Sequence, residues 1–187
     1  MRRFLFWILA LFLLSGCTRF SPQDPFEWNA DIRWLASNNF HSLEEGRVSA
    51  SAEPKGEFLR RLLVEKRVRV FVSLKGDIPE SSRRLIESYG ATLYTFQWSA
   101  QSVPPEKEIA QVFQLMQGGT MESPVHVFCR AGVDRTGYAR AYYRYYAQGW
   151  SARHALLEMY SFFHLPNALD RDLKERFKKF PNNRPVL

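Results

Sequence analysis

Short apolar runs alternate along the chain with longer segments that have helical periodicity. Three runs rich in β-branched and aromatic residues, 68–74, 91–98 and 124–129, predict strands, of which the first and the last are expected to be buried. A further short strand is predicted within residues 46–54. Between these strands, residues 55–66 carry apolar side chains at the spacing of one helix face, which predicts an amphipathic helix.

Prolines and glycines mark the ends of the other helical segments. Pro79 opens a segment that closes at Gly90, where a helix end favours glycine. Pro104 and Pro105 open the next one, and Ser151 is a good capping residue for a later one. The sequence therefore predicts helices at 55–66, 79–90, 103–119, 136–150 and 151–163.

Strands that alternate with helices predict an α/β fold, with one mostly parallel central sheet flanked by helices on both faces. Residues 41–187 form a single predicted domain, long enough to bury a sizeable core. Residues 17–40, punctuated by proline and asparagine, are predicted to be a tether leading into it. Acidic and basic residues interleave in 170–179, which predicts a solvated helix face.

The N-terminus has the layout of an export signal, because two arginines precede eleven uninterrupted apolar residues, 4–14. As a helix this run extends only about 16 Å, too short for a bilayer core of roughly 30 Å. Residues 14–17, LSGC, resemble the lipobox of bacterial lipoproteins. The resemblance implies a signal peptide at 1–16 and lipid on Cys17; the alternative is a plain secretory signal with an incidental cysteine.

A lipidated N-terminus predicts where the protein acts. We expect an exported lipoprotein that faces the periplasm or the cell surface and is attached to a membrane through its lipid. Thr18 stands where an aspartate would favour inner-membrane retention, so the outer membrane is the expected location.

The charge balance limits the partners. The formal charge of +7 falls to +5 when the two arginines of the signal segment are removed. This moderate excess fits an anionic substrate, or simply solubility. The basic residues are dispersed, so the chain lacks the footprint of a nucleic-acid-binding protein, and no nucleic-acid partner is predicted.

The two cysteines limit the redox and metal chemistry. Once Cys17 carries lipid, Cys129 is the remaining thiol and no intrachain disulfide can form. The histidines lack the spacing of metal ligands, so neither a metal nor another cofactor is predicted. A lone thiol outside the cytoplasm is a liability unless it is buried or chemically useful.

Cys129 opens the segment CRAGVDRTG, which runs from an apolar strand through a tight loop into a helix. In such a loop the backbone N–H groups and the helix N-terminus form an anion site, and their positive field favours a thiolate. Gly132 is free to adopt unusual dihedral angles. The planar guanidinium of Arg135 is able to clamp two phosphate oxygens. The segment therefore predicts a nucleophile that attacks phosphorus.

Residues 129–136, CRAGVDRT, resemble the C-x5-R-[ST] loop of the protein tyrosine and dual-specificity phosphatase superfamily. The order of elements from about 40 to 165 is similar to that of its small dual-specificity and phytase-like members. The resemblance implies a phosphomonoester hydrolase in which Cys129 forms a phosphocysteine intermediate and Arg135 stabilises the transferring phosphoryl group. Thr136 would assist the leaving thiolate, or is an ordinary first-turn residue. The implied phosphate-binding residues are Arg130, Ala131, Gly132, Val133, Asp134, Arg135 and Thr136.

The general acid departs from the family pattern. Members carry a W-P-D-x-G-x-P-like loop whose aspartate protonates the leaving oxygen, whereas residues 98–104, WSAQSVP, place Ala100 at that position. Three accounts stay open. In the first, Asp134 is the general acid; its other possible role is only to orient Arg135. In the second, Glu106 or Glu108 supplies the proton. In the third, the enzyme has no positioned acid, is slow and favours substrates with good leaving groups.

A second departure lies just before the nucleophile. Phe128 stands where many members have histidine, and His126 is predicted to be an ordinary strand residue.

The loop ending G-x-D-R-T resembles that of phosphatases acting on phosphoinositides. Arg130, beside the cysteine, suits a substrate with several phosphates, or else points to solvent. The resemblance thus implies inositol polyphosphate (phytate-like) or phosphoinositide substrates. The alternatives are a phosphotyrosine or dual-specificity protein phosphatase acting on phosphoproteins, and a catalytically impaired phosphate-binding pseudophosphatase.

Overall fold

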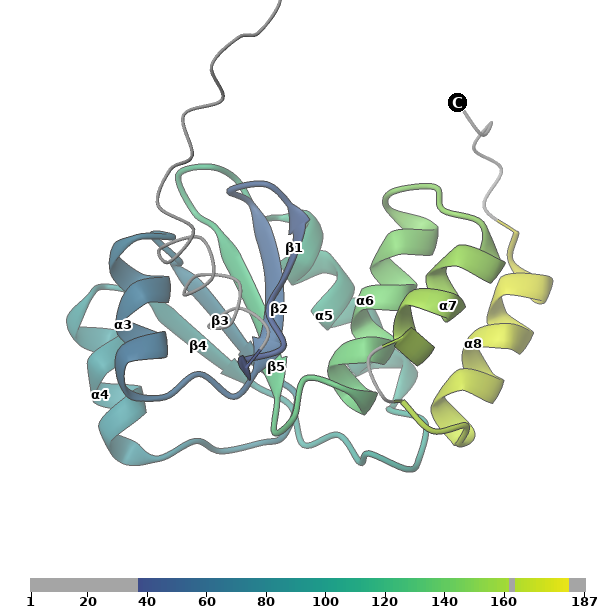
Figure 1. Ribbon diagram of the computed structural model, residues 1–187, viewed down its shortest axis with the longest axis horizontal. Coiled ribbons are helices and arrows are strands. Elements are labelled where there is room, and N and C mark those ends of the chain that lie inside the picture. The colour runs from purple at the N-terminus through teal and green to yellow at the C-terminus, as the bar shows by residue number, and fades with distance from the viewer. Residues whose placement is uncertain (1–36, 162–163, 182–187) are drawn as a thin grey trace, which may run out of the picture. The chain divides into compact units, whose positions relative to one another are not determined.

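A computed structural model describes residues 37–161 and 164–181 (Figure 1). The predicted signal peptide 1–16 and the predicted lipidation site Cys17 lie outside the described residues. Within the described ranges, no helix is long and apolar enough to cross a bilayer.

Five strands form one sheet in the order β1-β2-β5-β3-β4. Strand β1 pairs with β2 in an antiparallel sense, whereas the β2–β5, β5–β3 and β3–β4 pairs are parallel. The predicted mostly parallel sheet is therefore confirmed, and the antiparallel edge strand β1 is an addition that the apolar pattern did not indicate. The strands are β1 (His41–Glu44), β2 (Val48–Ala52), β3 (Val70–Ser73), β4 (Thr92–Thr95) and β5 (Val125–Cys129).

Helices cover both faces of the sheet, which confirms the predicted α/β class. Figure 1 shows α3 and α4 on one face and α5 and α6 on the other, with α7 and α8 packed beyond α6. The described helices are α3 (Gly56–Val64), α4 (Glu80–Ser88), α5 (Glu106–Gln117), α6 (Asp134–Tyr146), α7 (Ala152–Ser161) and α8 (Ala168–Lys179).

The helix ends follow the predicted punctuation. Pro79 and Pro105 are the residues before α4 and α5, and their fixed φ suits a helix start. Ser151 Oγ accepts a hydrogen bond from the His154 N–H at 3.2 Å, which caps α7. Helix α6 begins at Asp134, two residues before its predicted start, because the loop after β5 turns directly into it.

Helix α8 has a solvated face, as residues 170–179 predicted, but its opposite face is buried. Leu169, Leu173 and Phe177 lie in the main core. The ring of Phe177 stacks on that of Tyr145 in α6, with centroids 3.9 Å apart. This packing fixes α8, and the loop before it, relative to the start of α6.

The central strand β5 presents alternate side chains to the two faces of the sheet. Val125, Val127 and Cys129 belong to the core on the side of α5 and α6. His126 and Phe128 point the other way, where the His126 ring meets Phe128 at a centroid distance of 6.2 Å. The thiol of Cys129 therefore lies at the carboxyl end of the central strand, on the side covered by α6.

His126 is an ordinary buried strand residue, as expected. Its two ring nitrogens lie 2.9 Å and 2.8 Å from the hydroxyls of Ser49 and Ser51. Burial lowers the pKa of His126 to about 3, so the ring is neutral at neutral pH. It faces away from Cys129 and adds no charge to the site.

Candidate active site

The loop between β5 and α6 depends on a glycine. Gly132 has φ +71°, a conformation that side chains rarely adopt, and a Cβ there would lie 2.6 Å from the Ala52 backbone nitrogen. Because residue 132 is glycine, the loop that connects Cys129 to Asp134 is able to pack against the end of β2. The sequence prediction of unusual dihedral angles at Gly132 is thereby confirmed.

The backbone of this loop is oriented as an anion site. The carbonyl of Arg130 accepts from the Glu53 N–H at 3.3 Å, and the carbonyl of Ala131 accepts from Asn39 Nδ2 at 3.1 Å. In a trans peptide unit the N–H points opposite to the C=O, so both N–H groups that follow these carbonyls are turned away from those contacts. Within the described residues, the N–H groups of 130–133 donate to no other protein group. They are available to an anion.

Asn39 and His41 hold this loop from the outside. His41 Nε2 lies 2.8 Å from Asn39 Oδ1. Burial, aided by the charges of Arg140 and Arg144, lowers the pKa of His41 to about 3, so its ring is neutral. A neutral ring that donates through Nε2 fixes the Asn39 amide with Nδ2 toward Ala131. Asn39 comes from the segment predicted as tether, so sequence reasoning assigned it no role.

The guanidinium of Arg135 contacts the segment that corresponds to the family's acid loop. Arg135 Nη1 donates to the backbone carbonyl of Trp98 at 3.2 Å. The Trp98 side chain is buried, donates through Nε1 to Glu108 Oε2 at 2.8 Å and meets the Tyr138 ring edge-on at 6.0 Å. The structure thus joins the start of α6 to residues 98–104.

Two polar atoms in the first turn of α6 are buried without a hydrogen-bond partner among the described residues. They are Arg135 Nε and Thr136 Oγ1. The Cys129 side chain is itself buried at the base of the loop, with the residue 2% exposed. Buried polar atoms of this kind are costly unless a ligand satisfies them.

Arg140 is a further candidate residue that sequence reasoning missed. It is 1% exposed, one helical turn after Thr136. Burial lowers the pKa of Arg140 to about 10, although the negative charges of Glu158 and of the Cys129 thiolate oppose that shift. It stays a cation at neutral pH and its field favours a thiolate. The sequence signal that could have identified it is an arginine among the small and aromatic residues of the predicted helix 136–150.

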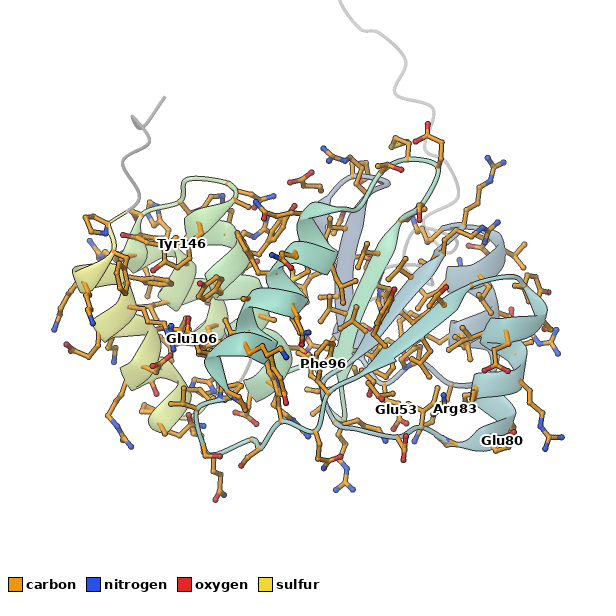
Figure 2. All side chains as sticks on the ribbon, turned by 180° about the vertical axis from the view of Figure 1, so that it is seen from behind. Glu53, Glu80, Arg83, Phe96, Glu106 and Tyr146 are labelled. Atoms are coloured by element: carbon orange, nitrogen blue, oxygen red, sulfur yellow. The ribbon has the colours of Figure 1, made fainter. Side chains whose placement is uncertain are left out.

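The structure separates the carboxyl groups considered as general acid. Glu108 Oε2 accepts from Trp98. Glu106, in the first turn of α5 and labelled in Figure 2, pairs with Arg176 of α8 at 2.7 Å. Asp134 is about one-third exposed, and its Oδ1 lies 2.8 Å from His164 Nδ1.

Asp134 faces the space beside Ala100. Both residues line one cavity of about 470 Å³, together with the loop before α8. Asn167 Nδ2 donates to the Ala100 carbonyl at 3.2 Å and ties that loop to residues 98–104. The cavity lining is completed by Gln101, Leu165, Pro166, Asn167, Ala168 and Arg171. A carboxyl group is thus present across the cavity from the position where the family's aspartate stands.

No group of three or more potential metal ligands occurs in residues 37–161 and 164–181.

No family model matches the chain. The dual specificity protein phosphatase TpbA of Pseudomonas aeruginosa is 39% identical over 54 residues, which span 29% of this chain and about a quarter of that relative. The crystal structure of P. aeruginosa TpbA matches far more of the fold, with a TM-score of 0.59 and 26% identity over 77% of this chain and 86% of TpbA. In sequence and in fold, the chain is similar to cysteine-dependent tyrosine and dual-specificity phosphatases.

Two further phosphatase structures share the fold at lower identity. The catalytic core of the PP-IP phosphatase Siw14 from S. cerevisiae has a TM-score of 0.64, with 20% identity over 76% of this chain and 85% of Siw14. PTPMT1 has a TM-score of 0.59, with 21% identity over 75% of this chain and 94% of PTPMT1. At these identities the two similarities concern the overall fold alone.

Proposed function

We propose that this chain is a cysteine-dependent phosphomonoester hydrolase that works through a phosphocysteine intermediate. The observation that carries the proposal is the loop after β5. This loop begins at Cys129, its backbone N–H groups have no other protein partner among the described residues, and it leads into Arg135 at the start of α6. Such a site favours a thiolate and binds a phosphoryl group through charge-assisted hydrogen bonds.

In the first step the Cys129 thiolate attacks phosphorus. The S–P bond forms with the sulfur lone pair while the P–O bond to the substrate breaks, and the leaving oxygen takes the proton of the Asp134 carboxyl group. The loop N–H groups and Arg135 hold the equatorial oxygens, where negative charge gathers.

In the second step water attacks the phosphocysteine. The water oxygen bonds to phosphorus, Asp134 takes the proton that the water loses, and the S–P electron pair returns to Cys129 as a thiolate. The buried hydroxyl of Thr136 is available to donate to that thiolate, which makes it a better leaving group. Phosphate then departs, and the site returns to its starting state.

We propose further that the substrate carries more than one phosphate, as inositol polyphosphates and phosphoinositides do. Arg130 is exposed next to Cys129, and Arg171 lines the cavity beside Asp134. Neither guanidinium pairs with a carboxylate within the described residues. Two free cations near one phosphate site favour a ligand with additional phosphates.

The similar structures include complexes with both a phosphotyrosine and a phosphoinositide ligand. A cysteine-to-serine variant of TpbA has been crystallised in complex with pTyr, and PTPMT1 in complex with PI(5)P. The second candidate function is therefore a phosphotyrosine or dual-specificity protein phosphatase. The two free arginines favour the polyphosphorylated ligand, because a phosphotyrosine side chain presents one phosphate.

A substrate panel tests the proposal. Phosphate release is measured from inositol hexakisphosphate, a phosphoinositide in micelles and a phosphotyrosine peptide, with wild type and Cys129→Ser. We expect turnover by wild type, highest on the polyphosphorylated substrates, and none by the variant, which still binds them. Binding without turnover by wild type would instead establish the pseudophosphatase, for which Ala100 is the reason.

We also propose that the protein is exported and held at a membrane, the outer one, through lipid on Cys17. The support is the LSGC sequence at 14–17. Metabolic labelling with a radioactive fatty acid tests it. We expect label on wild type and none on Cys17→Ser, and label on both would contradict this location for the lipid.

A further inference from the structure

We infer that His164 is a positioning residue for Asp134. It holds one carboxyl oxygen, so that the other oxygen faces the cavity beside Ala100 and exchanges protons there with the leaving group and with water. The inference rests on the proposed function and concerns the group that replaces the missing acid of residues 98–104.

The contact between His164 and Asp134 is short and asymmetric. The His164 side chain is completely buried, and its Nδ1 lies 2.8 Å from Asp134 Oδ1. Asp134 Oδ2 has no hydrogen bond to any described residue, and the Asp134 side chain is 34% exposed. One oxygen is therefore held from the protein interior while the other is open to the cavity.

The opposite side of the His164 ring faces a fixed carboxylate. His164 Nε2 lies 3.5 Å from Asp170 Oδ1, and Asp170 is 1% exposed. Tyr160 Oη and Lys174 Nζ donate to Asp170 Oδ2 at 2.7 Å and 2.9 Å. Burial alone would raise the pKa of Asp170, but these hydrogen bonds and the Asn167 backbone N–H hold it well below its usual value.

The arrangement is a chain of three groups from α8 to the phosphate loop: Asp170, His164 and Asp134. Titratable groups face the imidazole from each element packed against it: Asp134 on α6, Tyr160 on α7, and Asp170 with Lys174 behind it on α8. His164 Nε2 has no hydrogen-bond partner among the described residues, so the ring is held by the 2.8 Å contact of Nδ1 with Asp134 and by the packing around it. A fixed ring donates Nδ1–H to Asp134 Oδ1 and sets the direction of Oδ2.

Among the residues considered as general acid, Asp134 is the best placed to donate a proton. Ala100 cannot donate a proton, Glu108 is engaged with Trp98, and Glu106 with Arg176. Asp134 lines the same cavity as Ala100, so we expect the leaving oxygen to depart toward the Asp134 carboxyl group. A carboxyl proton on Oδ2 moves to the leaving oxygen as the P–O bond breaks, and the attacking water later returns one proton to Oδ2.

The leaving group separates positioning from simple structural support. An aryl phosphate such as p-nitrophenyl phosphate needs little protonation of its leaving oxygen, whereas an alkyl phosphate needs it. We expect His164→Ala to lower kcat on an alkyl phosphate about 10²-fold with little change in KM, and to lower it far less on p-nitrophenyl phosphate. Equal losses on both substrates would overturn the inference.

Three comparisons complete the test. In His164→Asn the amide nitrogen replaces Nδ1, so we expect most of the alkyl phosphate activity to return. His154→Ala removes an exposed histidine of α7 and should leave both activities unchanged. Vanadate affinity should be the same in wild type and His164→Ala, because the phosphate loop is intact; a large loss would indicate a collapsed loop and contradict the inference.

A readout without turnover keeps this inference distinct from the proposed function. The ¹⁵N resonances of the His164 ring are followed by NMR in wild type and in Asp134→Asn. We expect the Nδ1 signal to move in the variant, whatever the activity, because its partner has changed. An unchanged signal would overturn the inference, whereas the lack of turnover with every substrate would overturn only the proposed function.

Discussion

The guanidinium of Arg135 donates to the backbone carbonyl of Trp98 across 3.2 Å. This contact joins the helix that follows the Cys129 loop to residues 98–104, the segment that resembles the acid loop of tyrosine and dual-specificity phosphatases. Trp98 is in turn held by Glu108 and Tyr138. The position of Arg135 therefore depends on a packed aromatic anchor, although the aspartate expected two residues later is absent.

Arg135→Lys should lower kcat on any phosphomonoester by about 10²–10³-fold, because one ammonium group cannot reproduce the planar pair of donors at the developing negative charge. The measurement is steady-state kinetics with p-nitrophenyl phosphate. Arg153→Lys, at an exposed position of α7, is the matched control and should behave as wild type. A variant with unchanged kcat would remove Arg135 from the site.

Asn39→Ala should weaken phosphate binding without unfolding the domain. The side chain holds the Ala131 carbonyl away from the anion site, and its loss frees that peptide unit at a cost of about 1 kcal/mol. Calorimetric titration with inorganic phosphate or vanadate measures the effect. His41→Ala removes only the group that orients the Asn39 amide, so a smaller loss in the same direction is expected. Equal affinities in all three proteins would show that the outer contacts do not shape the loop.

Arg171→Ala should discriminate between substrates. If the cavity takes a second phosphate, kcat/KM falls about tenfold or more on inositol hexakisphosphate, as expected for loss of a charge-assisted hydrogen bond. It should change little on p-nitrophenyl phosphate, which has no second phosphate. Arg153→Ala makes the same change of net charge away from the cavity. If both variants lose activity equally on the polyphosphate, the effect is one of overall charge and the cavity is not a phosphate subsite.

The sequence was sufficient for features that depend on local pattern. The strand at 124–129, the glycine at 132 and the helix after it could be predicted, because they follow from apolar runs and from backbone geometry. The contact of His164 with Asp134 could not, since it links residues thirty positions apart through the packing of α7 and α8 on α6. Asn39 was missed for the same reason: it reaches Ala131 across a separation of 92 residues.

The buried histidine of β5 predicts how stability depends on pH. Burial lowers the pKa of His126 from 6.5 to about 3, so the unfolded chain binds a proton below about pH 6.5 that the folded chain does not. Stability is therefore fully present above that pH and decreases as the pH falls toward 3. Between pH 7.5 and pH 5 this one residue should cost about 2 kcal/mol of unfolding free energy, and His41 acts in the same direction.

Urea unfolding at pH 7.5 and pH 5 measures this loss in wild type and in His126→Gln, whose amide keeps a hydrogen-bonding group between Ser49 and Ser51 but does not titrate. The variant should be less stable than wild type at pH 7.5, because its side chain fills the site less well. Its stability should nevertheless fall less on acidification. A pH dependence as steep as that of wild type would show that other groups, and not His126, bind the proton on unfolding.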